Sequence, residues 1–155
     1  MDVNDARLSS QVVLAAATRR SAADWQEAIR LACALLEQRA AVRPEYADRC
    51  IATVEEHGPY IVLTPGIALA HARPEEGVER LGVSVVTLSE PVEFGHPDND
   101  PVDVVFAFGS PDDEQHLAVL AELARELSEG LGDRLRRADD DAAAQTMLER
   151  IAADD

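Results

Sequence analysis

The feature of this sequence that most limits its fold is a set of four short apolar runs in the middle of the chain. The runs favour strands and occupy residues 60–63, 67–70, 82–88 and 102–108. None alternates cleanly between polar and apolar residues, which is typical of strands that are covered on both faces. The sequence therefore predicts a sheet enclosed by other elements, and residues 11–15 are a candidate first strand.

Segments with helical periodicity lie before and after these runs. Helices are expected to open at Ser21, where Asp24 follows three residues later as a capping signal, and at Pro44, Pro111 and Asp139. The helix from Pro111 is expected to end near Gly130 and to bury one face, formed by Leu117, Leu120, Ala121, Ala124 and Leu127.

Together these elements predict one α/β domain in which a sheet lies between helices. No internal repeat, low-complexity tract or linker divides the chain. We expect the domain to span residues 1–155, with fraying limited to about the first ten residues and the last few.

Charge and composition narrow the possible partners. The chain carries 30 acidic and 14 basic residues, a formal net charge of −16, and every base is arginine. Such a surface repels the phosphate backbone of nucleic acids and anionic lipid headgroups, so neither is expected as a partner. No apolar run approaches the roughly 20 residues of a membrane-spanning helix, so we expect no membrane insertion and a cytoplasmic protein. Without lysine, P-loop and Schiff-base mechanisms are excluded.

The chain has four histidines, His57, His71, His96 and His116. A neutral imidazole is available near pH 7 and can attack phosphorus without a separate base, and the resulting P–N bond is labile enough for onward transfer. His71 has the most suggestive position, because it directly follows an apolar run, and α/β sheets commonly hold ligands at the carboxyl ends of strands. Arg73 offers a guanidinium fork for phosphate oxygens nearby.

Each of the other three histidines has an ordinary structural interpretation. His57 lies at a predicted helix end, and His96 lies in a polar loop where it is expected to be solvated. His116 falls in the first turns of a helix on the side facing the sheet, either as a core histidine or as a donor to a phosphoryl group on His71. No H-E-x-x-H, H-x-H or paired-cysteine spacing supports a metal site, and the two cysteines are expected to be core thiols.

Two stretches carry a resemblance to a known family. The first reads Gly-Pro-Tyr at 58–60 and His-Ala-Arg-Pro-Glu-Glu-Gly-Val at 71–78, and the second reads Asp-Asn-Asp-Pro-Val-Asp at 98–103. Both resemble the enzyme IIA proteins of the bacterial phosphoenolpyruvate-dependent sugar phosphotransferase system, in the mannitol/fructose-type family, and are most similar to its ascorbate-type branch. The similarity extends over about residues 20–151, including Asp-Trp-Gln-Glu-Ala at 24–28.

The resemblance implies a mostly parallel (mixed) sheet between helices and a phosphotransferase component without cofactor or metal. Such proteins accept a phosphoryl group on one histidine from the phosphocarrier protein HPr. They pass it to a cysteine of enzyme IIB, and the membrane enzyme IIC couples that transfer to sugar uptake. By motif, the phosphorylated histidine maps to His71 and an assisting histidine to His116, and the branch implies ascorbate as the sugar.

Two alternatives stay open beside the transport role. One is a regulatory phosphohistidine domain with the same fold and histidine, not coupled to transport. The other is a metal-dependent enzyme, which no ligand spacing in the sequence favours.

This chain departs from the family pattern at two places. Ala70 stands where relatives usually have proline before the active histidine, which removes a restraint on φ but no chemical group. Glu55-Glu56 stands where mannitol- and fructose-type relatives carry an Arg-Glu pair, so the cation that they use is missing there. Arg73 is the expected substitute as the residue that binds the phosphoryl group.

Overall fold

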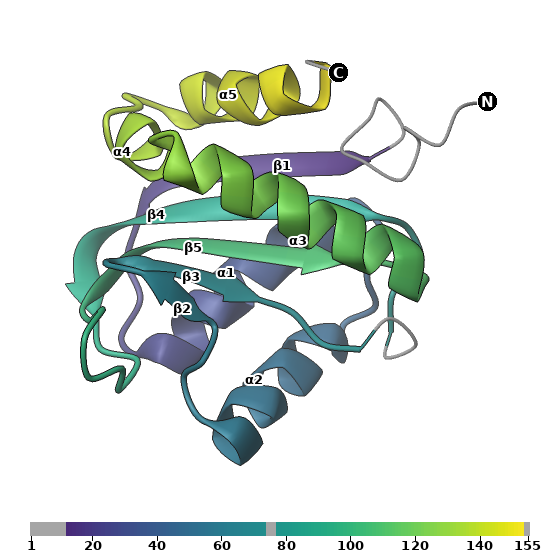
Figure 1. Ribbon diagram of the computed structural model, residues 1–155, viewed down its shortest axis with the longest axis horizontal. Coiled ribbons are helices and arrows are strands. Elements are labelled where there is room, and N and C mark those ends of the chain that lie inside the picture. Colours follow the sequence, from purple (N-terminus) through teal and green to yellow (C-terminus); the bar gives the residue numbers. More distant parts are fainter. Residues whose placement is uncertain (1–11, 74–76, 154–155) are drawn as a thin grey trace.

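A computed structural model describes residues 12–73 and 77–153 of the chain. Its centre is a five-stranded sheet in the order β1-β4-β5-β3-β2 (Figure 1). The strands are β1 (Val13–Arg20), β2 (Val62–Thr64), β3 (Ile67–Ala70), β4 (Gly82–Val92) and β5 (Val102–Gly109). β1 pairs with β4 and β3 with β5 in parallel, whereas β4 pairs with β5 and β2 with β3 antiparallel. The sheet is therefore mixed, and the predicted α/β class is confirmed.

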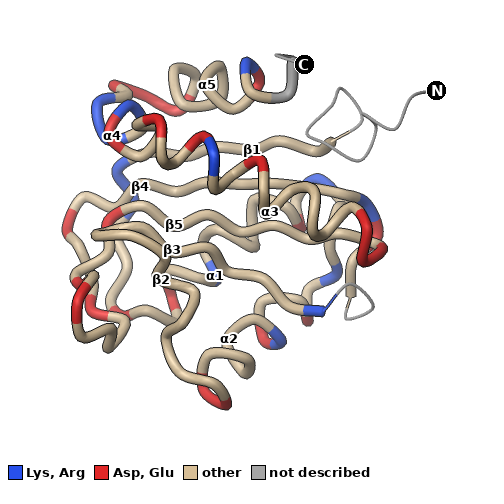
Figure 2. Tube along the Cα trace, viewed as in Figure 1, with Lys and Arg blue, Asp and Glu red and all other residues tan. Residues whose placement is uncertain are grey.

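Five helices cover the two faces of this sheet. Helices α1 (Trp25–Glu37) and α2 (Tyr46–His57) lie on one face, and α3 (Asp113–Ser128), α4 (Leu131–Arg136) and α5 (Asp141–Ala153) lie on the other (Figure 1). Charged residues gather on the helices and loops, and the middle of the strands is almost free of them (Figure 2). This distribution follows from a sheet whose two faces are both covered by helices.

The two faces of β3 explain why its sequence does not alternate. Ala68 and Ala70 pack into the core beneath α1 and α2, while Ile67 and Leu69 pack into a second core beneath α3, α4 and α5. All four side chains are buried. The alanines on one face of β3 and the larger residues on the other are all apolar, because each face packs against a layer of helices.

The start of α1 differs from the prediction. Ser21 does not open the helix, because β1 continues to Arg20 and the chain is still leaving the sheet there. The cap is Asp24, whose side chain accepts a hydrogen bond from the backbone N–H of Glu27 at 2.9 Å. In return, the carboxylate of Glu27 accepts one from the backbone N–H of Ala23 at 2.5 Å. This reciprocal pair satisfies two donors at the helix start and resembles a capping box.

The apolar face predicted for α3 was only partly right, because Leu120 and Leu127 pack against the core beneath this helix and the other three residues do not. Leu117 is 68% exposed, and Ala121 and Ala124 are exposed as well. The residues buried against the sheet are Val119 and Leu123. Because α3 carries leucine and alanine on several sides, periodicity alone does not identify the side that packs.

The neighbouring strands β3 and β5 determine where the predicted nucleophile, His71, lies. β3 and β5 run parallel in a register that pairs Ala70 with Ala107, so the residues that follow both strands meet at one edge of the sheet. His71 follows β3 at this edge, and β5 leads through residues 110–112 into α3. The helices of the described ranges include no candidate for a membrane-spanning segment.

Candidate functional site

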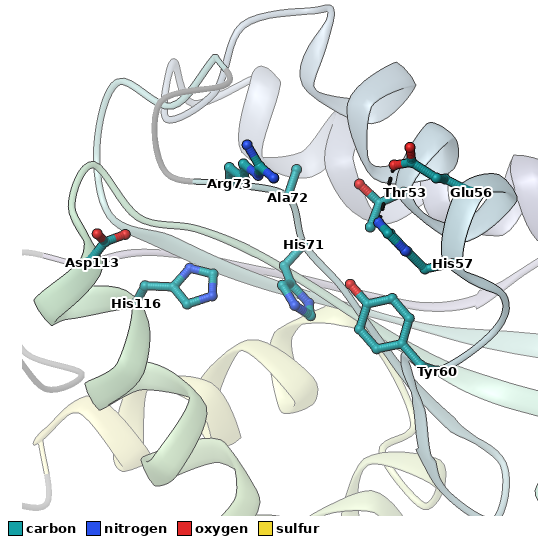
Figure 3. Close-up of a pocket in the computed structure, with 9 residues that line it drawn as sticks. All are labelled: Thr53, Glu56, His57, Tyr60, His71, Ala72, Arg73, Asp113 and His116. Atoms are coloured by element: carbon teal, nitrogen blue, oxygen red, sulfur yellow. Dashed lines mark ion pairs between the residues drawn. The ribbon is translucent and has the colours of Figure 1, made fainter.

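A pocket of about 490 Å³ opens at this edge of the sheet (Figure 3). Its walls come from the end of α2, the turn before β2, the segment after β3 and the start of α3. The lining residues are Thr53, Glu56, His57, Tyr60, His71, Ala72, Arg73, Asp113 and His116. The pocket therefore brings together all three residues that the sequence singled out, His71, Arg73 and His116.

His71 lies at the centre of a cluster of rings. Its imidazole stacks on Phe108, with 5.3 Å between ring centroids and 27° between planes. The ring of His116 approaches from one side at 5.5 Å, and Tyr60 meets His71 edge-on at 6.0 Å from the other (Figure 3). The imidazole is thus held in one orientation by three neighbouring rings.

One hydrogen bond distinguishes the two nitrogens of His71. Its Nδ1 lies 3.0 Å from the carbonyl oxygen of Leu69. A carbonyl can only accept, so in the neutral ring Nδ1 carries the proton and donates to Leu69. Nε2 then keeps its lone pair, which makes it the nucleophilic nitrogen of this tautomer.

The surroundings keep His71 neutral. Burial lowers its pKa below the usual value near 6.5, the hydrogen bond to Leu69 opposes this shift, and the neighbouring His116 adds to it. Burial also lowers the pKa of His116, against the opposing charge of Asp113. At neutral pH both rings are therefore uncharged, and a neutral His71 is the form that can attack phosphorus.

His116 comes from the first turns of α3, where Asp112 caps the helix. Its Nδ1 is buried and receives no hydrogen bond within the described part of the chain. Nε2 is therefore the nitrogen through which His116 can donate into the pocket. Its ring also packs against Phe108, with 4.9 Å between centroids, so the strand that supports His71 also positions His116.

The buried side chain of Tyr46 supports the cluster of rings around His71. The hydroxyl of Tyr46, in α2, donates to the carbonyl of Phe108 at 2.8 Å and accepts from the backbone N–H of Ala72 at 3.0 Å. Burial raises the pKa of Tyr46 well above its usual value near 10, so it stays protonated. Tyr46 thus joins the backbone beside His71 to the end of β5, and both of these backbone groups would be left without a partner if the hydroxyl were lost.

The charges around the pocket are mixed. Two acids, Glu56 and Asp113, line it. Glu56 lies 3.1 Å from Nε2 of His57, the last residue of α2. Arg73 is exposed at the rim and makes no ion pair with any other residue in 12–73 or 77–153. The residues after it, 74–76, lie outside the described part of the structure, and with them part of the motif at 71–78.

Sequence reasoning missed three members of this site. Tyr46 was not a candidate site residue, Tyr60 was placed only in a strand-forming run and in the Gly-Pro-Tyr motif, and Phe108 only at the end of another run. The Gly-Pro-Tyr motif was a signal for Tyr60, since a tyrosine directly after a helix stop is presented by a turn. The contacts of Tyr46 with Ala72 and Phe108 span 26 and 62 residues and leave no local signal.

Comparison with known proteins identifies the family. Residues 15–151 match the family described as "Phosphoenolpyruvate-dependent sugar phosphotransferase system, EIIA 2". Because this match covers most of the chain, the protein belongs to the EIIA 2 family of this phosphotransferase system.

Individual relatives agree with that membership. An ascorbate-specific PTS system EIIA component from Shigella boydii is 45% identical over 95 residues, which are 61% of this chain and 62% of the relative. The match thus spans somewhat less than two thirds of that relative's length. A component of the same description from Salmonella paratyphi A is 40% identical over 129 residues, 82% of each chain.

A solved structure shares the fold. The chain matches one from the complex of enzyme IIAMtl and phosphorylated enzyme IIBMtl of Escherichia coli with a TM-score of 0.72 and 25% identity. The match covers 92% of this chain and 97% of the other.

Proposed function

We propose that this protein is a phosphoryl carrier that accepts a phosphoryl group from phospho-HPr on Nε2 of His71 and passes it to a cysteine of enzyme IIB. The observation that carries the proposal is the state of the His71 ring. Nδ1 is engaged by the Leu69 carbonyl, burial favours the neutral form, and Nε2 is left to act in an open pocket beside His116.

The transfer follows from this arrangement. Nε2 of His71 attacks phosphorus in line, a new P–N bond forms, and the P–N bond of the donor breaks with its electron pair returning to the donor imidazole. Phosphoryl transfer depends mostly on positioning and on stabilising charge at the equatorial oxygens. His116 serves that role through Nε2, and Arg73 at the rim supplies a cation.

In the second half of the cycle, the thiolate of enzyme IIB attacks the same phosphorus. An S–P bond forms, and the N–P bond breaks with its electron pair returning to Nε2 of His71. Cys33 and Cys50 are both buried, and neither lines the pocket, so the acceptor thiol belongs to another chain.

Two exposed large side chains, one in the pocket wall and one outside it, suit a protein partner rather than a small substrate. Leu117, next to His116, is 68% exposed, and Tyr60, next to His71, is 47% exposed. HPr and enzyme IIB dock in turn on this surface in small and transient complexes. The relative from Escherichia coli, solved as a complex of enzyme IIA with phosphorylated enzyme IIB, supports enzyme IIB as the partner.

The transported sugar is ascorbate in this proposal, supported by the relatives described as ascorbate-specific. The sugar is handled by the membrane enzyme IIC and does not enter the His71 pocket. Since the phosphoryl group originates from phosphoenolpyruvate inside the cell, the protein works in the cytoplasm.

Reconstitution tests the proposal. The purified chain is incubated with phosphoenolpyruvate, enzyme I and HPr, and intact mass is measured before and after mild acid. We expect one acid-labile phosphoryl group, mapped by fragmentation to His71 and absent from His71→Ala. An unlabelled wild-type protein in the presence of phosphorylated HPr would contradict the proposal.

A further inference from the structure

Some polar side chains of the pocket already have a partner within the protein, and one does not. The Thr53 hydroxyl donates to the carbonyl of Arg49 at 2.9 Å, and His57 faces the carboxylate of Glu56 at 3.1 Å. Both are therefore already engaged. The hydroxyl of Tyr60 makes no hydrogen bond with any residue in the described ranges, although it belongs to a residue that lines the pocket.

Tyr60 is placed beside the reacting ring. Its own ring stands almost perpendicular to that of His71, at 86°, with 6.0 Å between centroids. The hydroxyl end points toward His71, on the side opposite to the ring of His116 (Figure 3). His71 thus lies between two side chains that can donate a hydrogen bond.

The backbone holds Tyr60 in this position. α2 ends at Gly58, whose φ of 89° belongs to the left-handed region that favours glycine. The N–H of Val62 then donates to the carbonyl of Pro59 at 3.0 Å, and the N–H of Leu69 donates to the carbonyl of Ile61 at 2.9 Å. The turn that carries Tyr60 is therefore fastened to the strand that leads into His71.

The charge of the pocket creates the need for such a donor. A phosphoryl group brings negative charge to a pocket lined by two acids, Glu56 and Asp113, in which the one arginine lies exposed at the rim. A neutral hydroxyl can stabilise phosphoryl oxygens by a charge-assisted hydrogen bond. Burial raises the pKa of Tyr60 above its usual value near 10, so the hydroxyl keeps its proton and acts as a donor.

We propose that Tyr60 is a catalytic residue whose hydroxyl donates a hydrogen bond to an oxygen of the phosphoryl group on His71, opposite to His116. This inference rests on the phosphoryl-carrier function proposed above. No proton leaves Tyr60 during transfer. The hydrogen bond forms as the phosphoryl group arrives, stabilises the charge on its oxygens, and is released when the group departs.

The test removes the hydroxyl and keeps the ring. Wild-type protein and Tyr60→Phe are phosphorylated with phosphoramidate, a small donor that needs no protein docking, and the rate is followed by intact mass. We expect Tyr60→Phe to react about tenfold more slowly or worse, as the loss of one hydrogen bond to a charged group predicts. Leu63→Ala is the matched control, since Leu63 is 43% exposed in β2 and does not line the pocket. It should react at the wild-type rate.

A second measurement separates chemistry from structure. Phosphorus NMR is used to titrate the phosphoryl group on His71 in both proteins. A donor to its oxygens stabilises the dianion, so the phosphoryl pKa should be higher in Tyr60→Phe than in wild type. Equal rates and equal phosphoryl pKa values in a wild-type protein that is labelled on His71 would overturn the role of Tyr60 alone. A wild-type protein that is labelled by neither phosphoramidate nor phospho-HPr would overturn the carrier function, and the role of Tyr60 with it.

Discussion

The loops at the two ends of the sheet each contain a histidine, and they use it in opposite ways. After β3, Nδ1 of His71 binds the Leu69 carbonyl and Nε2 is left to the pocket. Before β5, Nδ1 of His96 accepts the backbone N–H groups of Asp98 and Asn99 at 3.1 and 3.0 Å. The expectation that His96 is merely solvated was incomplete, because its ring organises the loop.

The carboxylate of Asp100 continues this pattern in the His96 loop. It accepts the backbone N–H groups of Phe94, Gly95 and His96 at 2.9, 2.6 and 3.1 Å. One loop thus directs its side-chain acceptors to its own backbone, whereas the His71 loop leaves polar groups available. The difference shows that a loop position alone does not make a histidine a candidate for catalysis. The ring nitrogen that makes no hydrogen bond to the protein must also face a pocket.

The largest effect is expected from His71→Ala. Loss of the nucleophile should reduce phosphoryl incorporation from phospho-HPr to background, while His96→Ala should still be labelled to one group per chain. Intact mass measures both. If His96→Ala lost the label while remaining folded, the division between the two loops would be wrong.

The next largest effect is expected from His116→Ala. Removing one preorganised donor to a developing charge costs on the order of 10²-fold in rate, so labelling should be slower by about that factor and still reach completion. Rapid-quench measurements with phospho-HPr give the rate, and His57→Ala serves as a control histidine at the pocket's edge. An unchanged rate in His116→Ala would remove its assisting role.

Tyr46→Phe should combine a smaller loss of rate with a loss of stability. The N–H of Ala72 and the carbonyl of Phe108 would become buried and unpaired, which costs about 1–3 kcal/mol of unfolding free energy. Urea unfolding measures that cost. Phosphoramidate labelling under conditions where the variant is folded measures the rate, which should fall several-fold because the backbone beside His71 is no longer fixed. A variant as stable and as fast as wild type would show that the hydroxyl supports nothing.

His96→Ala should affect stability alone. Two backbone N–H groups lose their acceptor, and because the loop is only partly buried the cost should be about 1 kcal/mol. Urea unfolding gives the value, and the phosphorylation rate of the folded variant should equal that of wild type. If His71→Ala were destabilised and His96→Ala were as stable as wild type, the structural role would belong to His71 and not to His96.

The smallest effect is the pH dependence that His71 introduces. Its pKa is lowered on folding, so below about pH 6.5 the unfolded chain binds a proton that the folded chain does not. The free energy of unfolding is therefore highest above the pKa of His71 in the unfolded chain. It decreases as the pH falls from there through the lower pKa of His71 in the folded protein. Proton NMR of the ring should give a midpoint below 6.5 for His71. A midpoint above 6.5 would contradict the lowering of the pKa by burial.

Much of the fold was predictable, because its signals are local. The non-alternating runs gave four strands close to their true bounds, and β3 was predicted in full as residues 67–70. The helix end at His57 was also predicted correctly, because the residues that stop the helix, Gly58 and Pro59, follow it directly. The packed side of α3 was predicted only in part, because the choice between Leu117 and Val119 is made by the sheet beneath the helix rather than by the helix itself.

The site divides in the same way. The positions of His71 and Arg73 could be inferred from a strand end and a motif, and the structure brings both into one pocket with His116. Their roles in transfer remain predictions. The support that Tyr46 gives depends on contacts with segments that are distant in the chain, so no local pattern could indicate it, whereas the Gly-Pro-Tyr motif marked Tyr60 but not the direction of its hydroxyl.

The pocket is built from both helical layers. Tyr60 follows the end of α2, whereas His116 belongs to α3 on the opposite face of the sheet, and His71 lies at the sheet edge between them. A phosphoryl group held by Tyr60 and His116 together would fix the distance between the two layers at this edge. The loaded and empty proteins would then present different outlines to a protein that docks across both layers. On the proposed function, a donor that fits the empty outline would be released once it had delivered its group, and an acceptor that fits the loaded outline would be selected next.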